Sequence, residues 1–492
     1  MQQQSKDTND TIVAISTPPG RGGIGIVRLS GPQARSIGES MVQLRQPLAP
    51  GRARFAEILD RTPADPSAKD SNAAPEAAPV LDEAVVTWFA APHSYTSEDV
   101  VEIAGHGAPV LLDALLRQCI AQGARLAEPG EFTQRAFLSG RLDLTQAEAV
   151  HDLIQSSTLQ QARTAARQLG GALSKQVQPV KEQLIALIAA LEAGIDFAED
   201  DLDLLPQEEI GRRMLQIAAP LKTLEDTFTY GRILRDGFRL ALAGRPNAGK
   251  SSLFNRLIRR DRAIVTAQPG TTRDPVTEQL DFAGIPVELI DTAGLRASTD
   301  EAERHGVAKS REAMVEADIV LLVLAANEPL QAEDIHLLRD AELHGARAGN
   351  LIVVINKIDL SPPPTLAEQS LAQHAPAPEA HPYTIVHTCA LHGAQTGVQT
   401  GIAALRQAIL DRLRSTPPSA DSTILTNLRQ HQAVSAAVRS LESAQAAAAA
   451  STPHEMLLLD LYEALNALDL LTGTTTSDDV LNLIFSTFCI GK

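Results

Sequence analysis

One stretch of eight residues constrains the fold of this chain more than any other. Residues 244–251 read Gly-Arg-Pro-Asn-Ala-Gly-Lys-Ser, between a strand-like apolar run at 238–243 and a helix-like run at 252–258. This sequence fits the pattern G-x-x-x-x-G-K-[ST], in which backbone N–H groups and a helix N-terminus surround phosphate oxygens. The pattern predicts that Lys250 reaches the β- and γ-phosphates of a nucleotide and that Ser251 ligates Mg²⁺.

Two later motifs indicate which nucleotide is bound. Asp-Thr-Ala-Gly at 291–294 follows the apolar run 286–290, and Asn-Lys-Ile-Asp at 356–359 follows the run 350–355. The aspartate of an N-K-x-D loop can accept hydrogen bonds from guanine N1–H and from its N2 amine, a donor pair that adenine lacks. A Gly-rich turn is the alternative for the phosphate loop alone, but it does not account for three motifs in this order. We therefore expect a parallel α/β domain that binds a guanine nucleotide.

Composition limits the remaining possibilities. The 492 residues suffice for about three domains. A net charge of −17 and an aromatic content of 3% argue against a broad basic or base-stacking nucleic-acid surface, so such contacts must be local or supplied by a partner. Cys119, Cys389 and Cys489 are too few and too scattered for a disulfide framework. We see no signal peptide and no membrane span, and we expect a cytoplasmic protein.

The pattern along the chain predicts a multidomain protein. Strand-like and helical segments mix at 11–139, whereas 145–230 has apolar spacings of three and four that indicate two or three long helices. Residues 422–472 are helical again, so a discontinuous all-α domain is expected to flank the inserted α/β domain. Two stretches rich in proline, 61–80 and 361–382, are predicted to be surface loops. The expected domains are 1–139 (α+β), 140–236 (first helical part), 237–414 (nucleotide-binding, Ras-like) and 415–492 (second helical part with a Cys-Ile-Gly-Lys tail).

One position poses a catalytic problem. In Ras-type GTPases a glutamine follows Asp-x-x-Gly and orients the attacking water, but here Leu295 occupies that position. Asn247 could hold a monovalent cation beside the phosphates, or it could only stiffen the loop. The acidic stretch 300–304 could act on water, or it could be a solvated charged segment. Thr272 is expected to be the second protein ligand of Mg²⁺, and Cys389-Ala390-Leu391 is expected to contact the base.

The order of these features resembles the MnmE (TrmE) family of tRNA-modification GTPases over nearly the whole chain. The resemblance is carried by residues 10–14, 18–23, 105–107, 129–137, 142–149, the nucleotide motifs and the closing Phe-Cys-Ile-Gly-Lys at 488–492. The chain departs from the family in its two proline-rich insertions. Arg141 replaces a frequent lysine and Cys389 replaces the usual serine. A mobile terminus is the alternative interpretation of the tail.

The resemblance implies a function that the motifs alone do not give. It implies a K⁺-activated GTPase that acts as a homodimer and as a heterotetramer with MnmG (GidA), which uses FAD and NADH. Together they would add an aminomethyl or carboxymethylaminomethyl group to C5 of the wobble uridine of certain tRNAs, with formyl- or methylene-tetrahydrofolate as the carbon donor. The alternatives are a ribosome-assembly GTPase of the Era/Der type, which would need a basic RNA-binding module, and a purely regulatory switch.

The resemblance also implies site residues. For folate these are Arg28, Glu102, Arg141 and Lys492. For K⁺ they are Asn247, Thr266, Gln268 and Thr271, and for Mg²⁺ Ser251 and Thr272. Glu303 would position water, acting with Lys250 and Asn247 in catalysis. The full set expected to contact the nucleotide and its ions is Asn247, Ala248, Gly249, Lys250, Ser251, Ser252, Thr266, Ala267, Gln268, Pro269, Gly270, Thr271, Thr272, Asp291, Thr292, Ala293, Gly294, Asn356, Lys357, Asp359, Cys389, Ala390 and Leu391.

Overall fold

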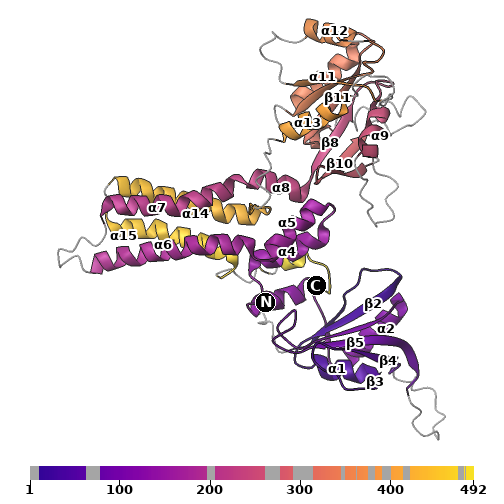
Figure 1. Ribbon diagram of the computed structural model, residues 1–492, viewed down its shortest axis with the longest axis vertical. Helices are drawn as coiled ribbons and strands as arrows, with labels where there is room; N and C mark the ends of the chain where they lie inside the picture. The colour runs from indigo at the N-terminus through magenta and orange to yellow at the C-terminus, as the bar shows by residue number, and fades with distance from the viewer. Residues whose placement is uncertain are drawn as a thin grey trace, which may run out of the picture. The chain divides into compact units, whose positions relative to one another are not determined.

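The computed structural model divides the chain into two compact units, whose elements are labelled in Figure 1. Unit 1 comprises Met1–His151, Gln168–Lys175 and Asn466–Lys492, and unit 2 comprises Asp152–Arg167 and Gln176–Leu465. The structure describes residues 10–61, 78–196, 206–260, 277–291, 314–344, 350–361, 363–374, 383–390, 401–413, 422–450, 452–474, 481 and 484–491. None of the helices within these ranges is long and apolar enough to cross a membrane.

Unit 1 contains a seven-stranded sheet in the order β3-β4-β5-β6-β2-β1-β7. Its strands are β1 Ile12–Ile15, β2 Gly22–Ser30, β3 Val42–Leu44, β4 Ala53–Leu59, β5 Val80–Phe89, β6 Val100–Gly107 and β7 Arg125–Leu126. Its helices include α1 Ala34–Met41, α2 Pro109–Ala121 and α3 Glu131–Leu138. Strand pairing is antiparallel except between β1 and β7. The mixture of strands and helices predicted at 11–139 is confirmed.

Side-chain alternation along β2 and β6 places polar groups opposite the core of this sheet. Val27 and Leu29 of β2 are fully buried in one hydrophobic cluster with Val101 and Ile103 of β6. Successive residues of a strand point to opposite faces, so the residues between them lie on the other face. Arg28 and Glu102 are directly paired in the β2–β6 register. The local sequence pattern thus brings these two charged side chains together.

The helical segments come from both sides of the nucleotide-binding part of the chain. They are α4 Leu144–Gln155, α5 Leu159–Leu169, α6 Ala172–Asp196, α7 Gln207–Asp226, α8 Phe228–Asp236, α14 Leu428–Ala449 and α15 His454–Thr472. Helix α14 packs against α7, and Tyr462 of α15 donates a hydrogen bond to Glu192 of α6. This pairing confirms the discontinuous helical domain. The predicted long helices at 145–230 are α6 and α7, while α4, α5 and α8 are shorter.

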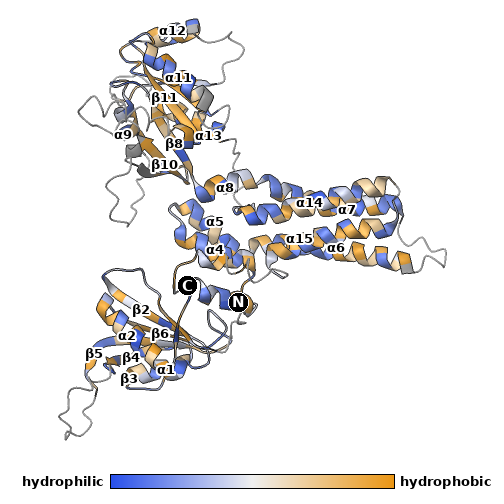
Figure 2. Ribbon diagram, turned by 180° about the vertical axis from the view of Figure 1, so that it is seen from behind, coloured by the Kyte–Doolittle hydropathy of each residue, from blue (hydrophilic) through white to orange (hydrophobic). Residues whose placement is uncertain are grey.

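The second sheet, in unit 2, has six strands in the order β13-β12-β11-β8-β10-β9. Its strands are β8 Phe238–Ala243, β9 Thr277–Phe282, β10 Ile285–Asp291, β11 Ile319–Ala325, β12 Leu351–Asn356 and β13 Thr384–Thr388. All pair in parallel except β9, an antiparallel edge strand. Strand β11 is hydrophobic and buried throughout (Figure 2), as expected where helices cover both faces. The helices include α9 Lys250–Arg260, α11 Ala332–His344, α12 Leu366–His374 and α13 Ile402–Arg412.

The prediction that residues 361–382 form a surface loop is wrong in its middle part. Helix α12 occupies residues 366–374, between the prolines at 362–364 and the next one at 376. Thr365 and Glu368 form a reciprocal cap, because Thr365 N donates to Glu368 Oε2 (2.7 Å) and Glu368 N donates to Thr365 Oγ1 (3.2 Å). This capping box starts the helix. The prediction relied on the number of prolines in the whole stretch and did not consider that the segment between them contains none.

Candidate functional site

The phosphate loop connects β8 to α9 and packs closely against two neighbouring strands. Gly244 has φ +143°, and a Cβ there would lie 2.3 Å from the carbonyl oxygen of Val323. Gly249 has φ +97°, and its Cβ would lie 2.1 Å from Asn356 Nδ2. Asn247 adopts φ +64° and is exposed. A side chain at either glycine would fill the space that the loop needs, so the local geometry fits a loop that closes around phosphate.

Lys250 lies inside the curve of this loop. The side chain is buried, and its Nζ donates to the carbonyl oxygens of Gly244 and of Arg245 (2.8 Å to the latter). Ser251 is exposed in the first turn of α9, followed by the half-buried Ser252. The predicted cation and hydroxyl are therefore placed together at a helix N-terminus, where the helix dipole favours anions.

Asn356 joins the phosphate loop to the loop after β13. Its Nδ2 donates to the carbonyl oxygen of Ala248 (3.1 Å), and its Oδ1 accepts from Thr388 Oγ1 (3.2 Å) and Ala390 N (3.3 Å). All of these groups are buried. The geometry therefore supports a role for Asn356 in holding two loops together. The sequence prediction did not identify Thr388, since nothing in its local sequence marks it as a partner of Asn356.

Asp359 forms a hydrogen bond with Cys389, which lies in the loop after β13. The Cys389 thiol donates to Asp359 Oδ1 at 3.2 Å. Lys357, which lies between Asn356 and Asp359 in the motif, adopts φ +66°. The sequence prediction placed Cys389 in the loop that contacts the base. In the structure its buried side chain also contacts the aspartate that is expected to recognise guanine.

Several predicted site residues lie outside the described part of the chain. They are Thr266, Ala267, Gln268, Pro269, Gly270, Thr271, Thr272, Thr292, Ala293, Gly294, Leu295, Glu303, Leu391 and Lys492. Asp291 is described only as the last residue of β10. Within the described ranges, no group of three or more His, Cys, Asp or Glu side chains could hold a metal ion. The predicted ion ligands are mainly hydroxyl, amide and backbone oxygens, which suits Mg²⁺ and K⁺ better than a transition metal.

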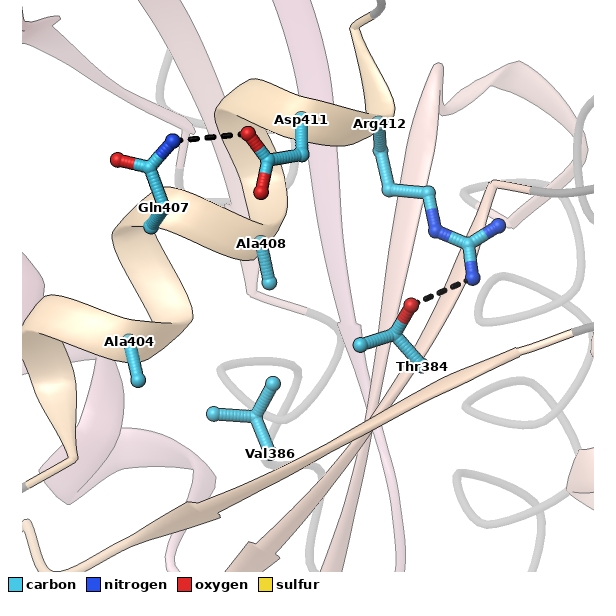
Figure 3. Close-up of a pocket in the computed structure, with 7 residues that line it drawn as sticks. All are labelled: Thr384, Val386, Ala404, Gln407, Ala408, Asp411 and Arg412. Carbon is cyan, nitrogen blue, oxygen red and sulfur yellow. Dashed lines mark hydrogen bonds between the residues drawn. The ribbon is translucent and has the colours of Figure 1, made fainter.

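A groove of about 390 Å³ lies elsewhere in the same domain, between β13 and α13 (Figure 3). Thr384 at its edge is the first residue of β13 and accepts a hydrogen bond from Arg412 (2.7 Å). The base-contacting residues instead follow the last residue of this strand. Ligands of open α/β sheets bind at the carboxyl ends of the strands. The groove is therefore separate from the nucleotide site.

In unit 1, the predicted folate residues Arg28 and Glu102 form an ion pair. Arg28 Nε and NH2 lie 2.9 and 2.8 Å from Glu102 Oε1. The Arg28 guanidinium carbon is 6.0 Å from the centre of the Tyr95 ring, and that of Arg141 is 5.8 Å from the same ring. Burial raises the pKa of Tyr95, which keeps its hydroxyl protonated. Two predicted residues, Arg28 and Arg141, thus lie near one aromatic side chain that the sequence prediction did not include, and Arg28 connects Glu102 to them.

The end of the chain is attached to the same place. Arg28 NH1 and Ser16 Oγ donate to the carbonyl oxygen of Gly491 at 3.3 and 3.1 Å. Ile490 forms an antiparallel bridge with Pro129, and Gly130 N donates to the carbonyl of Cys489 (3.3 Å). These contacts disfavour a mobile tail. They place the carbonyl group of Gly491, two residues after the exposed Cys489, against Arg28.

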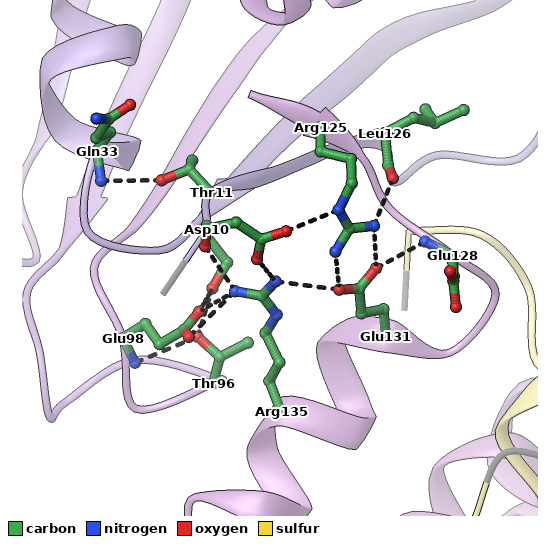
Figure 4. Close-up of polar contacts among 11 residues, drawn as sticks. Asp10, Thr11, Gln33, Thr96, Glu98, Arg125, Leu126, Glu128, Glu131 and Arg135 are labelled. Atoms are coloured by element: carbon green, nitrogen blue, oxygen red, sulfur yellow. Dashed lines mark hydrogen bonds and ion pairs between the residues drawn. The ribbon is translucent and has the colours of Figure 1, made fainter. Parts of the chain in front are cut away.

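A partly buried ion network in the same unit was not predicted from the sequence (Figure 4). Arg135 of α3 contacts Asp10, Glu98 and Glu131, and Arg125 of β7 contacts Asp10 and Glu131. The side chains of Arg135 and Glu131 are only 6% and 4% exposed. Burial opposes ionisation of Glu131, but hydrogen bonds from Arg125, Glu128 N and Arg135 lower its pKa overall. The network joins α3 to β7 and to Asp10, two residues before the start of β1.

Solved structures with similar parts include two GTP-binding proteins. The G domain of the FeoB iron transporter of T. maritima has a TM-score of 0.25 and 24% identity, and the match covers 36% of this chain and 98% of that one. Aquifex aeolicus Era bound to GDP and AlF₄⁻ has a TM-score of 0.27 and 24% identity, covering 41% and 66%. These scores are low, so the assignment of the chain depends on sequence matches.

Sequence matches extend over nearly the whole chain. The family described as "MnmE helical domain" matches residues 144–489, and "GTP-binding protein TrmE N-terminus" matches residues 11–141. The tRNA modification GTPase MnmE of Koribacter versatilis is 51% identical over 487 residues, covering 98% of this chain and 99% of that protein. MnmE of Heliobacterium modesticaldum is 40% identical over 485 residues with the same coverage. The chain therefore belongs to the MnmE (TrmE) family of tRNA modification GTPases.

Proposed function

We propose that this chain hydrolyses GTP in support of tRNA wobble-uridine modification, in which an aminomethyl or carboxymethylaminomethyl group is added to C5. The observation that carries the proposal is the network of Asn356, which joins the phosphate loop at Ala248 to the base loop at Thr388 and Ala390. This network lies within one α/β sheet whose β12 leads directly to Asp359. The N-terminal match and the full-length relatives favour this function over an Era/Der-type assembly GTPase.

In the proposed mechanism, the phosphate loop binds the nucleotide through backbone N–H groups and Lys250. Asp359 would accept hydrogen bonds from guanine N1–H and from its N2 amine, and Ser251 with Thr272 would ligate Mg²⁺. The proposed K⁺ site would supply positive charge that stabilises the negative charge developing on the phosphates during hydrolysis. Asn247 is exposed on the loop, and its side chain is proposed to supply one ligand of this ion.

The remaining catalytic roles are proposed from the family resemblance. Thr271 and the backbone of Thr266 and Gln268 would complete the K⁺ site, and Glu303 would position the attacking water in place of a glutamine. Leu295 cannot form that hydrogen bond. These residues lie outside the described part of the chain, so variants rather than geometry must test them.

The folate site is proposed at the Arg28–Glu102 pair. A pterin presents adjacent N–H donors that a carboxylate such as Glu102 can accept, and cations suit the glutamate part of a folate. Both guanidinium contacts of Arg28 use Oε1 of Glu102. The guanidinium group of Arg141 also lies near the Tyr95 ring, and Lys492 follows the docked Gly491 in the sequence. Formyl- or methylene-tetrahydrofolate would supply the carbon that is transferred.

We further propose the assembly that the family resemblance implies. The chain would form a homodimer and a heterotetramer with an MnmG (GidA) partner that carries FAD and uses NADH, and together they would act on tRNA. The proposed domains are 1–139, 140–236, 237–414 and 415–492. The pairing of α7 with α14 supports joining the second and fourth of these into one helical body.

The proposed function is tested in a deletion strain complemented with plasmid-borne variants. Mass spectrometry of tRNA nucleosides should show the wobble aminomethyl group with the wild-type gene, and its loss with Lys250→Ala and with Glu102→Ala. Glu442→Gln, at an exposed pair with Lys222, is the matched control and should behave as wild type. Unchanged wobble nucleosides in the deletion strain itself would refute the function.

A further inference from the structure

Arg245, the second residue of the phosphate loop, is held by two carboxylates. Its Nε donates to Asp334 Oδ2 at 2.7 Å, and its NH2 donates to Glu328 Oε2 at 2.8 Å. The Arg245 side chain is 16% exposed, that of Asp334 5% and that of Glu328 44%. Glu328 follows β11, and Asp334 lies in the first turn of α11. We name these three residues the Arg245 clamp.

The backbone of Arg245 holds the lysine of the loop. Its carbonyl oxygen accepts from Lys250 Nζ at 2.8 Å and from Ala248 N at 3.3 Å. Asp334 Oδ2 also accepts from Gln331 N (3.0 Å), so the start of α11 fixes the carboxylate. A continuous set of contacts therefore runs from α11 through Asp334 and Arg245 to Lys250.

The guanidinium of Arg245 is directed at carboxylates that neutralise it. A forked pair of charge-assisted hydrogen bonds fixes both the position and the orientation of an arginine side chain. Because Glu328 and the buried Asp334 both pair with the Arg245 guanidinium, its positive charge is not directed at the phosphates, although Arg245 belongs to the phosphate loop. The clamp instead determines where the Arg245 carbonyl, and hence Lys250, lies.

We propose that Arg245 is a positioning residue for nucleotide binding, and that Glu328 and Asp334 hold it so that Lys250 is kept in place to meet the β- and γ-phosphates. The inference rests on the proposed GTP binding of this domain. It assigns Arg245, Glu328 and Asp334 a role in affinity for the nucleotide and none in stabilising charge during hydrolysis.

The test uses the full-length chain. Nucleotide dissociation constants are measured by fluorescence with a labelled GDP, and kcat and KM are measured with GTP in KCl. Arg245→Ala and Asp334→Asn should each weaken GDP binding roughly tenfold, as expected for loss of a charged hydrogen bond. Glu328→Gln should have a smaller effect because Glu328 is more exposed. The double variant Arg245→Ala with Asp334→Asn should bind about as weakly as either single variant, because the two residues share one interaction.

Two further variants distinguish a positioning role of Arg245 from a general loss of stability in the domain. Arg239 at the start of β8 also contacts two carboxylates, Glu288 (2.9 Å) and Glu316 (3.2 Å), but lies at the opposite end of that strand from the phosphate loop. Arg239→Ala is therefore the matched control and should leave nucleotide affinity unchanged. Arg245→Lys keeps the charge but loses the planar fork, so it should restore affinity only in part.

The outcomes are distinct. If the Arg245 clamp positions Lys250, the variants raise KM and Kd, while kcat at saturating GTP stays within about twofold of the wild-type value. A fall in kcat for Arg245→Ala with unchanged Kd, and no change for Asp334→Asn, would show instead that Arg245 acts on the phosphates. Wild-type affinity in all clamp variants would also overturn the proposal. Absence of GTP binding by the wild-type chain would refute the proposed function rather than the clamp.

Discussion

Replacement of Glu131 by glutamine should loosen the N-terminal part of the protein around α3. Glu131 Oε1 lies 2.6 Å from Arg125 NH2 and 3.0 Å from Arg135 NH2, and Oε2 accepts from Glu128 N (2.8 Å). Glutamine has nearly the same shape but carries no charge and has only one acceptor oxygen. Arg135 would then keep Asp10 and Glu98 as its only carboxylate partners among those that the structure shows.

The expected cost follows from burial and from the partners that remain. Loss of one member of a buried ion pair costs about 3–5 kcal/mol, because the other charge stays buried. Two features reduce this value here. Arg125 is well exposed to solvent, which screens its charge, and Arg135 retains two carboxylates. We therefore expect the free energy of local opening to fall by about 2–3 kcal/mol near pH 7.

Amide hydrogen exchange followed by mass spectrometry measures this quantity in the full-length protein, because it reports the opening of each segment separately. Peptides from β1 and α3 should exchange roughly 30- to 150-fold faster in Glu131→Gln. This ratio corresponds to a decrease of about 2–3 kcal/mol in the free energy of local opening. Peptides from α14 should not change. Glu442→Gln, at the exposed pair with Lys222, is the control and should leave both regions as in the wild type.

The same network predicts a pH dependence. The pKa of Glu131 is lower in the folded chain than its ordinary value, so its stabilisation is complete above the unfolded pKa of about 4.3 and is lost as pH falls through the folded pKa. The difference between wild type and Glu131→Gln should therefore shrink below about pH 4. Equal exchange of α3 in the two proteins at pH 7 would refute the reasoning.

Four further predictions concern the two proposed sites. Asp359→Asn should lose GTP affinity and gain affinity for xanthosine triphosphate in competition assays, and unchanged GTP affinity would exclude this loop from base recognition. Calorimetry should show that Glu102→Ala weakens reduced-folate binding by about 1–3 kcal/mol, whereas equal binding would place the site elsewhere. GTP turnover should be much faster in KCl than in NaCl at equal ionic strength, and Asn247→Ala should remove most of that difference; equal rates for the wild type would exclude the cation mechanism. Cys389→Ala should weaken GTP binding about two- to tenfold while Cys389→Ser restores it, since a hydroxyl can also donate to Asp359, and wild-type affinity in the alanine variant would show that the thiol is dispensable.

The sequence predicts those parts of the structure that depend on residues close together in the chain. The phosphate loop, its flanking strand and helix, and the strands leading to Asp291 and Asn356 follow from short motifs and apolar runs. The ion network does not, because Arg135 and Asp10 are 125 positions apart and nothing in the local sequence around either residue indicates that the two pair. Arg245 illustrates the same limit. It occupies a variable position of the motif, and its partners become visible only when β11 and α11 are in place.

Both proposed sites use cations that the protein itself already orients. Lys250 donates to carbonyl oxygens of its own loop, and Arg28 contacts Glu102 and the carbonyl of Gly491. Cations that are shielded from solvent need such acceptors, because burial without a partner is costly. A phosphate or folate carboxylate must therefore exchange with these internal acceptors, and the affinity it gains is the difference between two sets of charged hydrogen bonds. Residues that hold the internal acceptors in place, such as the Arg245 clamp and the docked tail, should then influence ligand affinity without touching the ligand.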